Sequence, residues 1–315
     1  MAQTDQPLLV VAGPTASGKS AMAAALAQRF DGEVVSADSM QIYREMDIAT
    51  AQPSAEEMRG VPHHLLGILA PSEGYSVASY AAHARAVIAD IHRRGKIPVL
   101  AGGTGLYIQA VVDHILFAPQ EGDERIRTQL RELLETKGPE ALWSELNAVD
   151  PAYAKELHPH NTNRIIRAIE LYRTSGLTMA EQREASRREP SPYRLFMLGL
   201  TCRDRQKLYD RIDSRVDRMV SDGLLDEARA FLAREDARTA RQAIGYKELA
   251  GYFDGSQTLD EAIEHVKRET RRYAKRQLTW FRRDERIYWI YVDEYQNFHE
   301  VYKKCEKVVE RSGIL

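Results

Sequence analysis

The sequence contains few cysteines and no long apolar segment. Cys202 and Cys305 are the only cysteines among its 315 residues, and they lie far apart, outside any metal-ligand spacing. Both are predicted to be reduced thiols, which excludes a fold held together by a disulfide. No run of about 18 apolar residues is present, and the N-terminal residues lack a basic segment followed by an apolar one. We therefore expect a cytoplasmic protein with neither a membrane helix nor a signal peptide.

The sequence also has little net charge. The total of −2 taken alone argues against a nucleic-acid partner, but the charges are distributed unevenly. Residues 267–286 hold nine Lys and Arg against three Asp and Glu. A helix is predicted over about 260–283, with Arg268, Arg272 and Lys275 in a stripe that is able to follow a phosphate backbone. A solvated basic face is the alternative. The predicted packing face of the same helix comprises Ile263, Val266, Thr270, Tyr273, Gln277 and Trp280.

A phosphate-binding loop is the strongest motif present. Residues 13–20 follow the apolar run 8–11 and complete the pattern GxxxxGK[ST] between a predicted strand and a predicted helix. The backbone N–H groups of such a loop and the positive end of the following helix bind phosphate oxygens, and Lys19 adds a full charge. Ser20 is placed to hold a magnesium ion on the phosphates. The loop consists of Gly13, Pro14, Thr15, Ala16, Ser17, Gly18, Lys19 and Ser20.

The first third of the chain alternates strand and helix signals, with strands at about 8–12, 33–37 and 97–101. This rhythm predicts an α/β fold in which helices cover a P-loop NTPase-like parallel sheet. Ligands collect at the carboxyl ends of parallel strands, so the loops that follow these three strands are expected to converge. Residues 193–201 and 288–292 are predicted to add two further strands.

An inserted all-helical domain is predicted over residues 121–191, which leaves 1–120 and 192–315 as the catalytic core. The insertion is charged, has a helical period and shows no strand signal. Helix starts or breaks within it are marked by Pro139, Pro151 and Pro159.

Asp38 ends the second predicted strand, where an NTPase carries its metal-binding aspartate. No second acidic residue adjoins Asp38. It is followed instead by polar and aromatic groups that are able to bind a planar ligand, with Ser39, Met40, Gln41 and Tyr43 in this segment. An aspartate that faces a nucleobase can accept a proton from an amine. A magnesium ligand and the N-cap of a following helix are the alternative roles for Asp38.

Seven sequence blocks together resemble one protein family. In chain order they are GPTASGKS, SADSMQIYREMDIATAQPS, VPHHLLGIL, AGGTGLYIQA, NRIIRAIE, QAIGYKEL and YAKRQLTWFRRD. These blocks look like those of tRNA dimethylallyltransferases, also called tRNA isopentenyltransferases. The resemblance implies transfer of a dimethylallyl group from dimethylallyl diphosphate to N6 of the adenosine 3′ of the anticodon, position 37. The implied substrates are tRNAs that read codons beginning with U, and the products are N6-(dimethylallyl)adenosine and diphosphate.

The resemblance changes the ligand expected at the phosphate loop, which is otherwise typical of nucleotide-binding and ATP-binding proteins. The loop, with Lys19 and Mg²⁺, would hold the diphosphate of the prenyl donor, and no nucleoside triphosphate would be needed. Asp38 matches the general base of the family, and Thr15 matches a residue near the reacting centre. Arg215 resembles an arginine that reaches the diphosphate, with Arg211 one helical turn away as the alternative.

The resemblance also implies the contacts with tRNA. The target adenosine would be flipped into a channel, and the inserted domain would hold the anticodon stem-loop. For Gln109 an ordinary helix side chain is the alternative, and the block 242–248 has two open roles, a channel wall or an RNA contact. The implied tRNA-binding residues are Asp38, Ser39, Met40, Gln41, Thr104, Gln109, Arg127, Thr162, Asn163, Arg164, Ile165, Ile166, Arg167, Arg272, Lys275 and Arg276.

Three other functions are compatible with a phosphate-binding loop. An adenylate isopentenyltransferase would use the same donor on a free nucleotide, but it has little use for a helical insertion or a basic stripe. A P-loop kinase would consume ATP and carry a lid of arginines. A non-catalytic RNA-binding protein would show no turnover, and the pairing of Thr15 with Asp38 argues against it. A monomer with no obligate protein partner is expected, because no heptad seam is present.

Overall fold

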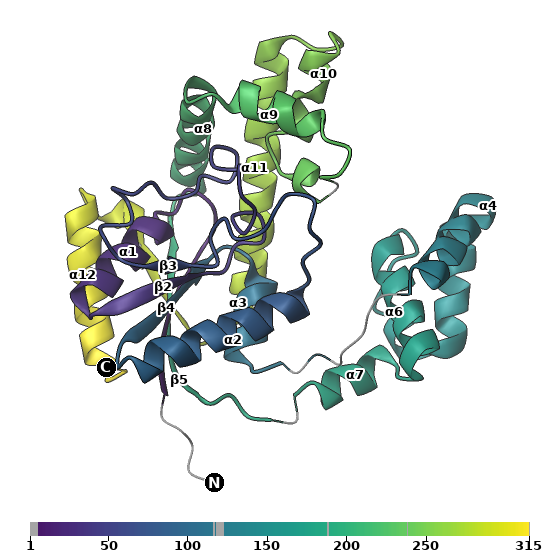
Figure 1. Cartoon of the computed structure of the whole chain (residues 1–315), viewed down its shortest axis with the longest axis horizontal. Helices are drawn as coiled ribbons and strands as arrows, with labels where there is room; N and C mark the ends of the chain where they lie inside the picture. The colour runs from purple at the N-terminus through teal and green to yellow at the C-terminus, as the bar shows by residue number, and fades with distance from the viewer. Residues whose placement is uncertain (1–5, 116, 118–122, 188, 238, 315) are drawn as a thin grey trace. The chain divides into compact units, whose positions relative to one another are not determined.

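The computed structural model describes residues 6–115, 117, 123–187, 189–237 and 239–314 (Figure 1). These residues form two compact units. The first combines the chain up to Val112 with the chain from Pro192 onward, and the second is Asp113–Ser191. The second unit begins at Asp113, eight positions before position 121, where the sequence predicted the insertion to start. No helix in the described ranges is long and apolar enough to cross a membrane.

The first unit contains a six-stranded sheet in which every pairing is parallel, which confirms the predicted fold class. The order β3-β2-β4-β1-β5-β6 puts β1 between β4 and β5, near the centre. Only the two-residue β3 lacked a strand signal, because so short a strand shows no alternation. The strands are β1 (Gln6–Ala12), β2 (Gly32–Ser36), β3 (His63–His64), β4 (Ile97–Gly102), β5 (Tyr193–Thr201) and β6 (Ile287–Tyr291).

Helices cover both faces of this sheet (Figure 1). Side chains alternate between the two faces of a strand, so β1 contributes to two cores. Its residues Leu8 and Val10 pack with α2 (Val77–Arg93), α3 (Gly105–Val112) and α11 (Leu259–Phe281). Its residues Leu9 and Val11 pack with α1 (Lys19–Arg29) and α12 (Phe298–Arg311). A strand buried on both faces must be apolar throughout, which explains the continuous apolar run before the phosphate loop.

The remaining helices of the first unit lie beyond the carboxyl ends of the strands. They are α8 (Arg205–Ser221), α9 (Leu224–Leu232) and α10 (Ala250–Phe253), with 3-10 turns at Ala240–Gln242, Lys247–Leu249 and Val292–Glu294.

The predicted packing face of α11 is correct in part. Val266 and Gln277 are buried, and Thr270 and Tyr273 line a cavity. Trp280, however, is 37% exposed. It lies over the backbone of the glycine that begins α3, where an added Cβ would stand 2.2 Å from Trp280 Cδ1. The indole is therefore only partly buried, which the helical period could not reveal.

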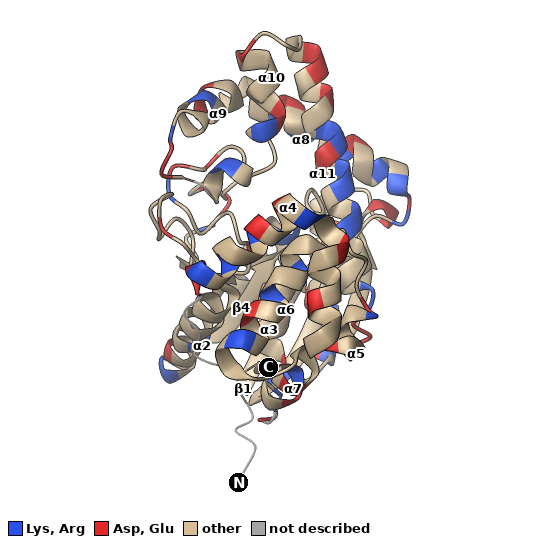
Figure 2. Ribbon diagram, turned by 90° about the vertical axis from the view of Figure 1, so that its right-hand side faces the viewer, with Lys and Arg blue, Asp and Glu red and all other residues tan. Residues whose placement is uncertain are grey.

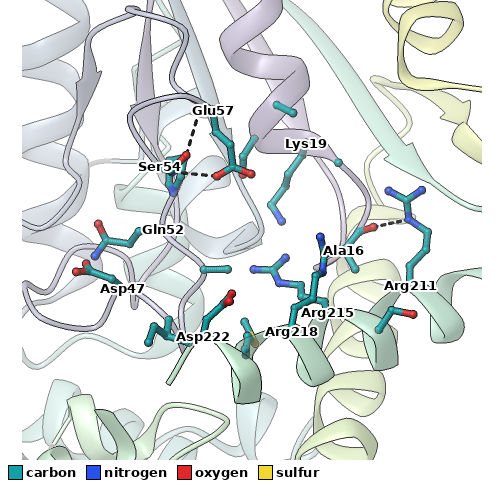
Figure 3. A pocket seen from close by; sticks show the side chains of 18 of the residues that line it. Ala16, Lys19, Asp47, Gln52, Ser54, Glu57, Arg211, Arg215, Arg218 and Asp222 are labelled. Carbon is teal, nitrogen blue, oxygen red and sulfur yellow. Dashed lines mark hydrogen bonds between the residues drawn. The ribbon is translucent and has the colours of Figure 1, made fainter. Parts of the chain in front are cut away.

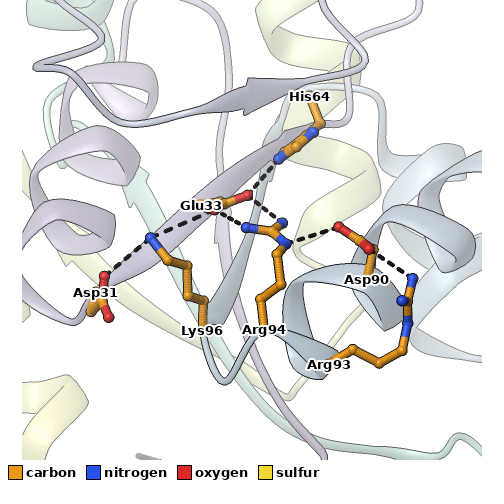
Figure 4. Close-up of polar contacts among 7 residues, drawn as sticks. All are labelled: Asp31, Glu33, His64, Asp90, Arg93, Arg94 and Lys96. Atoms are coloured by element: carbon orange, nitrogen blue, oxygen red, sulfur yellow. Dashed lines mark hydrogen bonds and ion pairs between the residues drawn. The ribbon is translucent and has the colours of Figure 1, made fainter.

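An ionic cluster lies near the start of β2, away from the strand carboxyl ends (Figure 4). Glu33 is 2% exposed and accepts hydrogen bonds from the Arg94 guanidinium, and His64 Nε2 lies 2.7 Å from its carboxylate. Lys96 and Asp90 complete the cluster. The bonds from Arg94, and then from His64, lower the pKa of Glu33 to about 2, against the effect of burial. His64 thus ties β3 to β2 through Glu33.

The second unit is helical over its described residues. The Gly138–Pro139 pair interrupts its longest helix, with Gly138 at φ 80°, and Pro151 begins the next one, as the prolines predicted. The helices are α4 (Glu124–Val149), α5 (Pro151–Ala154), α6 (Thr162–Ser175) and α7 (Met179–Ala185). The core between α4, α5 and α6 includes Leu130, Leu142, Leu146, Tyr153, Ile165, Ile166 and Ile169.

Candidate active site

The phosphate loop has the backbone that its motif requires. It joins β1 to α1, and Gly18 adopts a left-handed conformation, φ 89°, directly before Lys19 begins the helix. Gly13 lies so close to β5 that an added Cβ would stand 2.3 Å from the Leu200 carbonyl oxygen. The first N–H groups of a helix have no partner within it, so the start of α1 presents a ready anion site.

Two cationic side chains enter the space in front of this loop. Figure 3 shows Lys19 from α1 and Arg215 from α8 pointing into the same hollow. Burial, and next the charge of Arg215, lowers the pKa of Lys19 to about 8. Burial also lowers the pKa of Arg215. Two desolvated positive charges in one hollow are costly unless an anion joins them, so this hollow is suited to a phosphate group.

Arg211 and Arg215 lie one turn apart in α8 but make different contacts. Arg211 donates its Nε–H to the Ala16 carbonyl oxygen at 2.9 Å and so braces the phosphate loop (Figure 3). Arg215 makes no such contact with the loop backbone and instead reaches the cavity that also contains Asp38.

Two cavities meet beside the loop. One, of about 320 Å³, is lined by Thr15 and Asp38, and the other, of about 800 Å³, extends to Glu57, Arg218 and Asp222 (Figure 3). Both are lined by Lys19, Ser20, Arg215 and Met219. A phosphate group held there is therefore accessible from two directions, and Asp38 lies on one of them.

The backbone holds the Asp38 carboxylate in place. Its Oδ1 accepts the N–H groups of Met40 at 2.9 Å and Gln41 at 3.3 Å. The Thr104 hydroxyl, from the loop after β4, accepts the N–H of Ser39 at 3.0 Å. Residues 39–45 form bends and turns with a single β-bridge at Tyr43 and no helix, so the alternative in which Asp38 caps a helix does not apply.

Gln41 does not point freely into the cavity. Its side-chain amide donates to the carbonyl oxygens of Thr50 and Ala51, both at 3.1 Å. It therefore joins the Asp38 turn to the loop at Thr50 and Ala51, and its Oε1 accepts a hydrogen bond from the Ser36 hydroxyl at 3.4 Å.

Gln277 completes the junction of the three loops. It is 5% exposed, accepts the N–H of Thr15 at 2.9 Å, and donates to the Gly103 carbonyl oxygen at 3.0 Å. The loops after β1, β2 and β4 thus converge, as the positions of their strands predicted. The helical period predicted Gln277 on the packing face of α11 without a polar role. An amide within an otherwise apolar stripe was the available signal.

The block 242–248 forms a wall of the smaller cavity. Five of its residues line that cavity: Gln242, Ala243, Ile244, Gly245 and Lys247. Tyr246 is buried, and its hydroxyl donates to Glu227 Oε1 at 2.8 Å. The Glu227 carboxylate also accepts the N–H groups of Ile48 and Ala49, at 2.9 and 2.8 Å. Glu227 therefore holds this wall against the loop that carries Ile48 and Ala49.

Gln109 lies in a different place from Asp38. It lines a separate hollow of about 440 Å³ with Trp280, Phe281 and Arg283. The structure does not bring Gln109 into the cavity of the predicted base.

The predicted tRNA-binding residues of α6 differ in exposure. Asn163, Arg164 and Arg167 are exposed, and Thr162 is partly so. Ile165 is fully buried and Ile166 nearly so, in the core of the second unit. The side chains of these two isoleucines hold the helix in place and are not available to RNA.

Two of the predicted RNA-binding arginines form ion pairs with the buried residue Glu170. It is 1% exposed and forms ion pairs with Arg127 Nε at 2.9 Å and Arg167 Nη1 at 2.8 Å. A buried carboxylate requires such compensation. Arg127 and Arg167 therefore have a structural role within the second unit, whatever else they bind.

Lys and Arg residues recur along α11, as the blue segments of the ribbon in Figure 2 show. Arg272 pairs with Glu269, whereas Lys275 is exposed. Arg276 lies over the Tyr273 ring, 5.6 Å from its centroid, and lines the cavity of Asp38. The stripe thus leads to the mouth of that cavity.

Fold and site together define an α/β P-loop protein whose phosphate site opens into a carboxylate-bearing cavity. The IPP transferase family matches residues 41–284, and the chain belongs to this family. A tRNA dimethylallyltransferase of Halalkalibacterium halodurans is 48% identical over 90% of each chain. One of Thermoanaerobacter sp. is 45% identical over 95% of this chain and 96% of its own.

Solved structures of transferases of this kind are also similar to the chain. The full-length tRNA isopentenylpyrophosphate transferase of Bacillus halodurans is 44% identical, with a TM-score of 0.72 over 97% of this chain and 96% of its own. A eukaryotic dimethylallyltransferase, solved while acting on tRNA, is 30% identical, with a TM-score of 0.76 over 88% of this chain and 70% of its own.

Proposed function

We propose that this protein transfers the dimethylallyl group of dimethylallyl diphosphate to N6 of the adenosine 3′ of the anticodon in tRNA. Its substrates would be tRNAs that read codons beginning with U. The observation that supports this proposal best is the cavity in which Asp38 and the phosphate loop, with Lys19 and Arg215, face the same space. Transfer to a weakly nucleophilic amine needs a carboxylate there to accept the proton of the amine, whereas a kinase would have no amine to deprotonate.

The donor diphosphate would be bound by the phosphate-loop N–H groups, Lys19 and Arg215. Arg215 is favoured over Arg211 because Arg211 already binds the Ala16 carbonyl oxygen. These positive groups stabilise the charge that develops as the C–O bond of the donor breaks. Thr15 lines the same cavity, and its hydroxyl would donate to the bridging oxygen of the leaving group.

Ser20 would hold a magnesium ion on that diphosphate. It lies in the first turn of α1 and lines both cavities. Within the described residues, no group of three or more His, Cys, Asp or Glu side chains is placed to bind a metal. A single hydroxyl suits Mg²⁺, which commonly takes its other ligands from phosphate oxygens and water. When bound, the ion would neutralise charge on the leaving diphosphate.

Asp38 would act as the general base. As N6 forms its bond to the prenyl carbon, a proton leaves N6 for the Asp38 carboxylate, and diphosphate departs with the electron pair of the broken C–O bond. The N–H groups of Met40 and Gln41 fix one carboxylate oxygen, which leaves the second oxygen for the amine.

The tRNA would be bound by both units. The basic stripe of α11, with Arg272, Lys275 and Arg276, would contact backbone phosphates, and exposed residues of α6 such as Asn163 and Arg164 would contact the anticodon stem-loop. The target adenosine would leave its stack and enter the cavity beside Ser39, Met40 and Thr270. We propose a cytoplasmic setting, since Cys202 and Cys305 are both unpaired and the substrate would be tRNA. The monomer expected from the sequence stays a prediction.

The proposal is tested by incubating the protein with an unmodified tRNA that has adenosine after its anticodon. Magnesium and dimethylallyl diphosphate are added without ATP, and the nucleosides are analysed by mass spectrometry. A five-carbon adduct on adenosine is expected. The Asp38→Ala variant should lose this product, whereas Asp260→Asn, a control at an exposed position, should form it as the wild type does. Adduct on free AMP but not on tRNA would replace the proposal with an adenylate isopentenyltransferase. ATP consumption without any adduct would replace it with a kinase.

A further inference from the structure

Gln277 joins segments of the first unit that are distant in sequence. It is separated from Thr15 by 262 positions and from Gly103 by 174, yet its amide binds the backbone of both. The Thr15 N–H can only donate and the Gly103 carbonyl can only accept, so the two partners together require a group with both capacities. The carboxamide of Gln277 provides both.

The space around this amide is closed. An added Cβ on Gly103 would stand 2.2 Å from Gln277 Nε2, so the loop after β4 lies directly against the amide. Gln277 is also buried within α11, whose core neighbours Val266, Ala274 and Phe281 fix the helix. The amide therefore has little freedom to move. Its dimensions fix the distance between the Thr15 N–H and the Gly103 carbonyl oxygen.

The connection continues to Asp38. Thr104 follows Gly103 and accepts the N–H of Ser39, and Ser39 follows Asp38. Thr15, at the other end of the amide, belongs to the loop that would hold the leaving group. A change in the Gln277 bonds is thus transmitted to the distance between leaving group and base.

We propose that Gln277 is a positioning residue for prenyl transfer, which aligns the phosphate loop with the Asp38 turn. This inference rests on the proposed function and deepens it. Gln277 binds the backbone of both loops and the Tyr273 hydroxyl, and it takes no part in proton transfer. Its loss should affect the chemical step more than donor binding, because a misplacement of about 1 Å can lower a rate about 100-fold.

Two substitutions separate this role from a merely structural one. Gln277→Met has a similar volume and removes both hydrogen bonds. Gln277→Glu keeps the acceptor for Thr15, and its second oxygen can donate to Gly103 only when the carboxyl is protonated. Gln206→Met, at an exposed position in the first turn of α8, is the control.

The experiment measures kcat, the KM of donor and of tRNA, binding of inorganic diphosphate, and thermal unfolding for each protein. Gln277→Met is expected to lower kcat about 100-fold while its diphosphate affinity stays within about threefold of the wild type. The kcat of Gln277→Glu relative to wild type is expected to fall as pH rises, as the carboxyl ionises and repels the Gly103 carbonyl. Gln206→Met is expected to match the wild type.

The inference is overturned if Gln277→Met keeps its kcat within about twofold of the wild type, or if the loss appears only in KM. A pH-independent ratio for Gln277→Glu would overturn it as well. If both variants unfold, Gln277 supports the fold and not the alignment, and the inference fails. A wild-type protein that forms no adduct refutes the proposed function together with this inference, whereas active wild type with active variants refutes the inference alone.

Discussion

Lys19 and Arg215 extend from two helices, α1 and α8, into one hollow beside the phosphate loop (Figure 3). Each is desolvated there, and burial lowers the pKa of each. Such a pair is unfavourable in the free protein and becomes favourable when a polyphosphate binds, so much of the anion selectivity of the site is present before the ligand arrives.

Donor capture should therefore depend on pH through Lys19. With a pKa of about 8 in the free protein, the ammonium loses its proton as pH rises through that value. We expect kcat/KM for dimethylallyl diphosphate to be constant below this point and to fall about tenfold per pH unit above it. Lys19→Arg should move the fall to higher pH, because a guanidinium stays charged. A profile that is the same in both proteins would contradict this role of Lys19.

Asp38→Asn should separate binding from chemistry. The asparagine oxygen can still accept the N–H groups of Met40 and Gln41, so the turn is expected to keep its shape. Loss of a general base should lower kcat by about 10² to 10⁴. Inorganic diphosphate should bind to the variant as to the wild type in calorimetry. Weak diphosphate binding would instead indicate that Asp38 acts through the metal or the loop.

Arg211→Ala and Arg215→Ala form a matched pair, one helical turn apart. Removal of Arg215 should lower kcat/KM by about 10² to 10³, because a charge aimed at the leaving group is lost. Removal of Arg211 breaks one charged hydrogen bond to Ala16 and should cost about tenfold. Steady-state kinetics with varied donor distinguish the two, and a larger effect for Arg211 would reverse the assignment.

Glu33→Gln should destabilise the first unit without changing catalysis. Its partner Arg94 is 39% exposed and can be rehydrated, so we expect a loss of about 2 kcal/mol in urea unfolding at neutral pH. The pKa of Glu33 is lowered from 4.5 to about 2, so its stabilisation is present above pH 4.5 and is lost as pH falls toward 2. The free energy of unfolding of Glu33→Gln should therefore lack this pH-dependent contribution. Equal stability of both proteins at pH 7 would show that the cluster in Figure 4 contributes nothing.

Much of the fold could be predicted, because its strands are buried on both faces or separated by strong turn signals. The predicted strand at 193–201 coincides with β5, and the helix expected at about 260–283 is α11 at Leu259–Phe281. The two-residue β3 and the exposure of Trp280 could not be predicted. The first is too short to show a period, and the second depends on a glycine in another segment.

The sequence by itself determined the features that consist of neighbouring residues: the phosphate loop, the helical insertion and the sequence blocks of the family. Such features depend on local spacing, which a single chain displays completely. Only the tertiary structure decided that Arg215 and not Arg211 reaches the Asp38 cavity, that Glu227 holds the wall at 242–248, and that Gln277 joins two loops. These outcomes depend on the rotation of α8 and α11 against the sheet and on contacts between distant segments, and no local pattern encodes them.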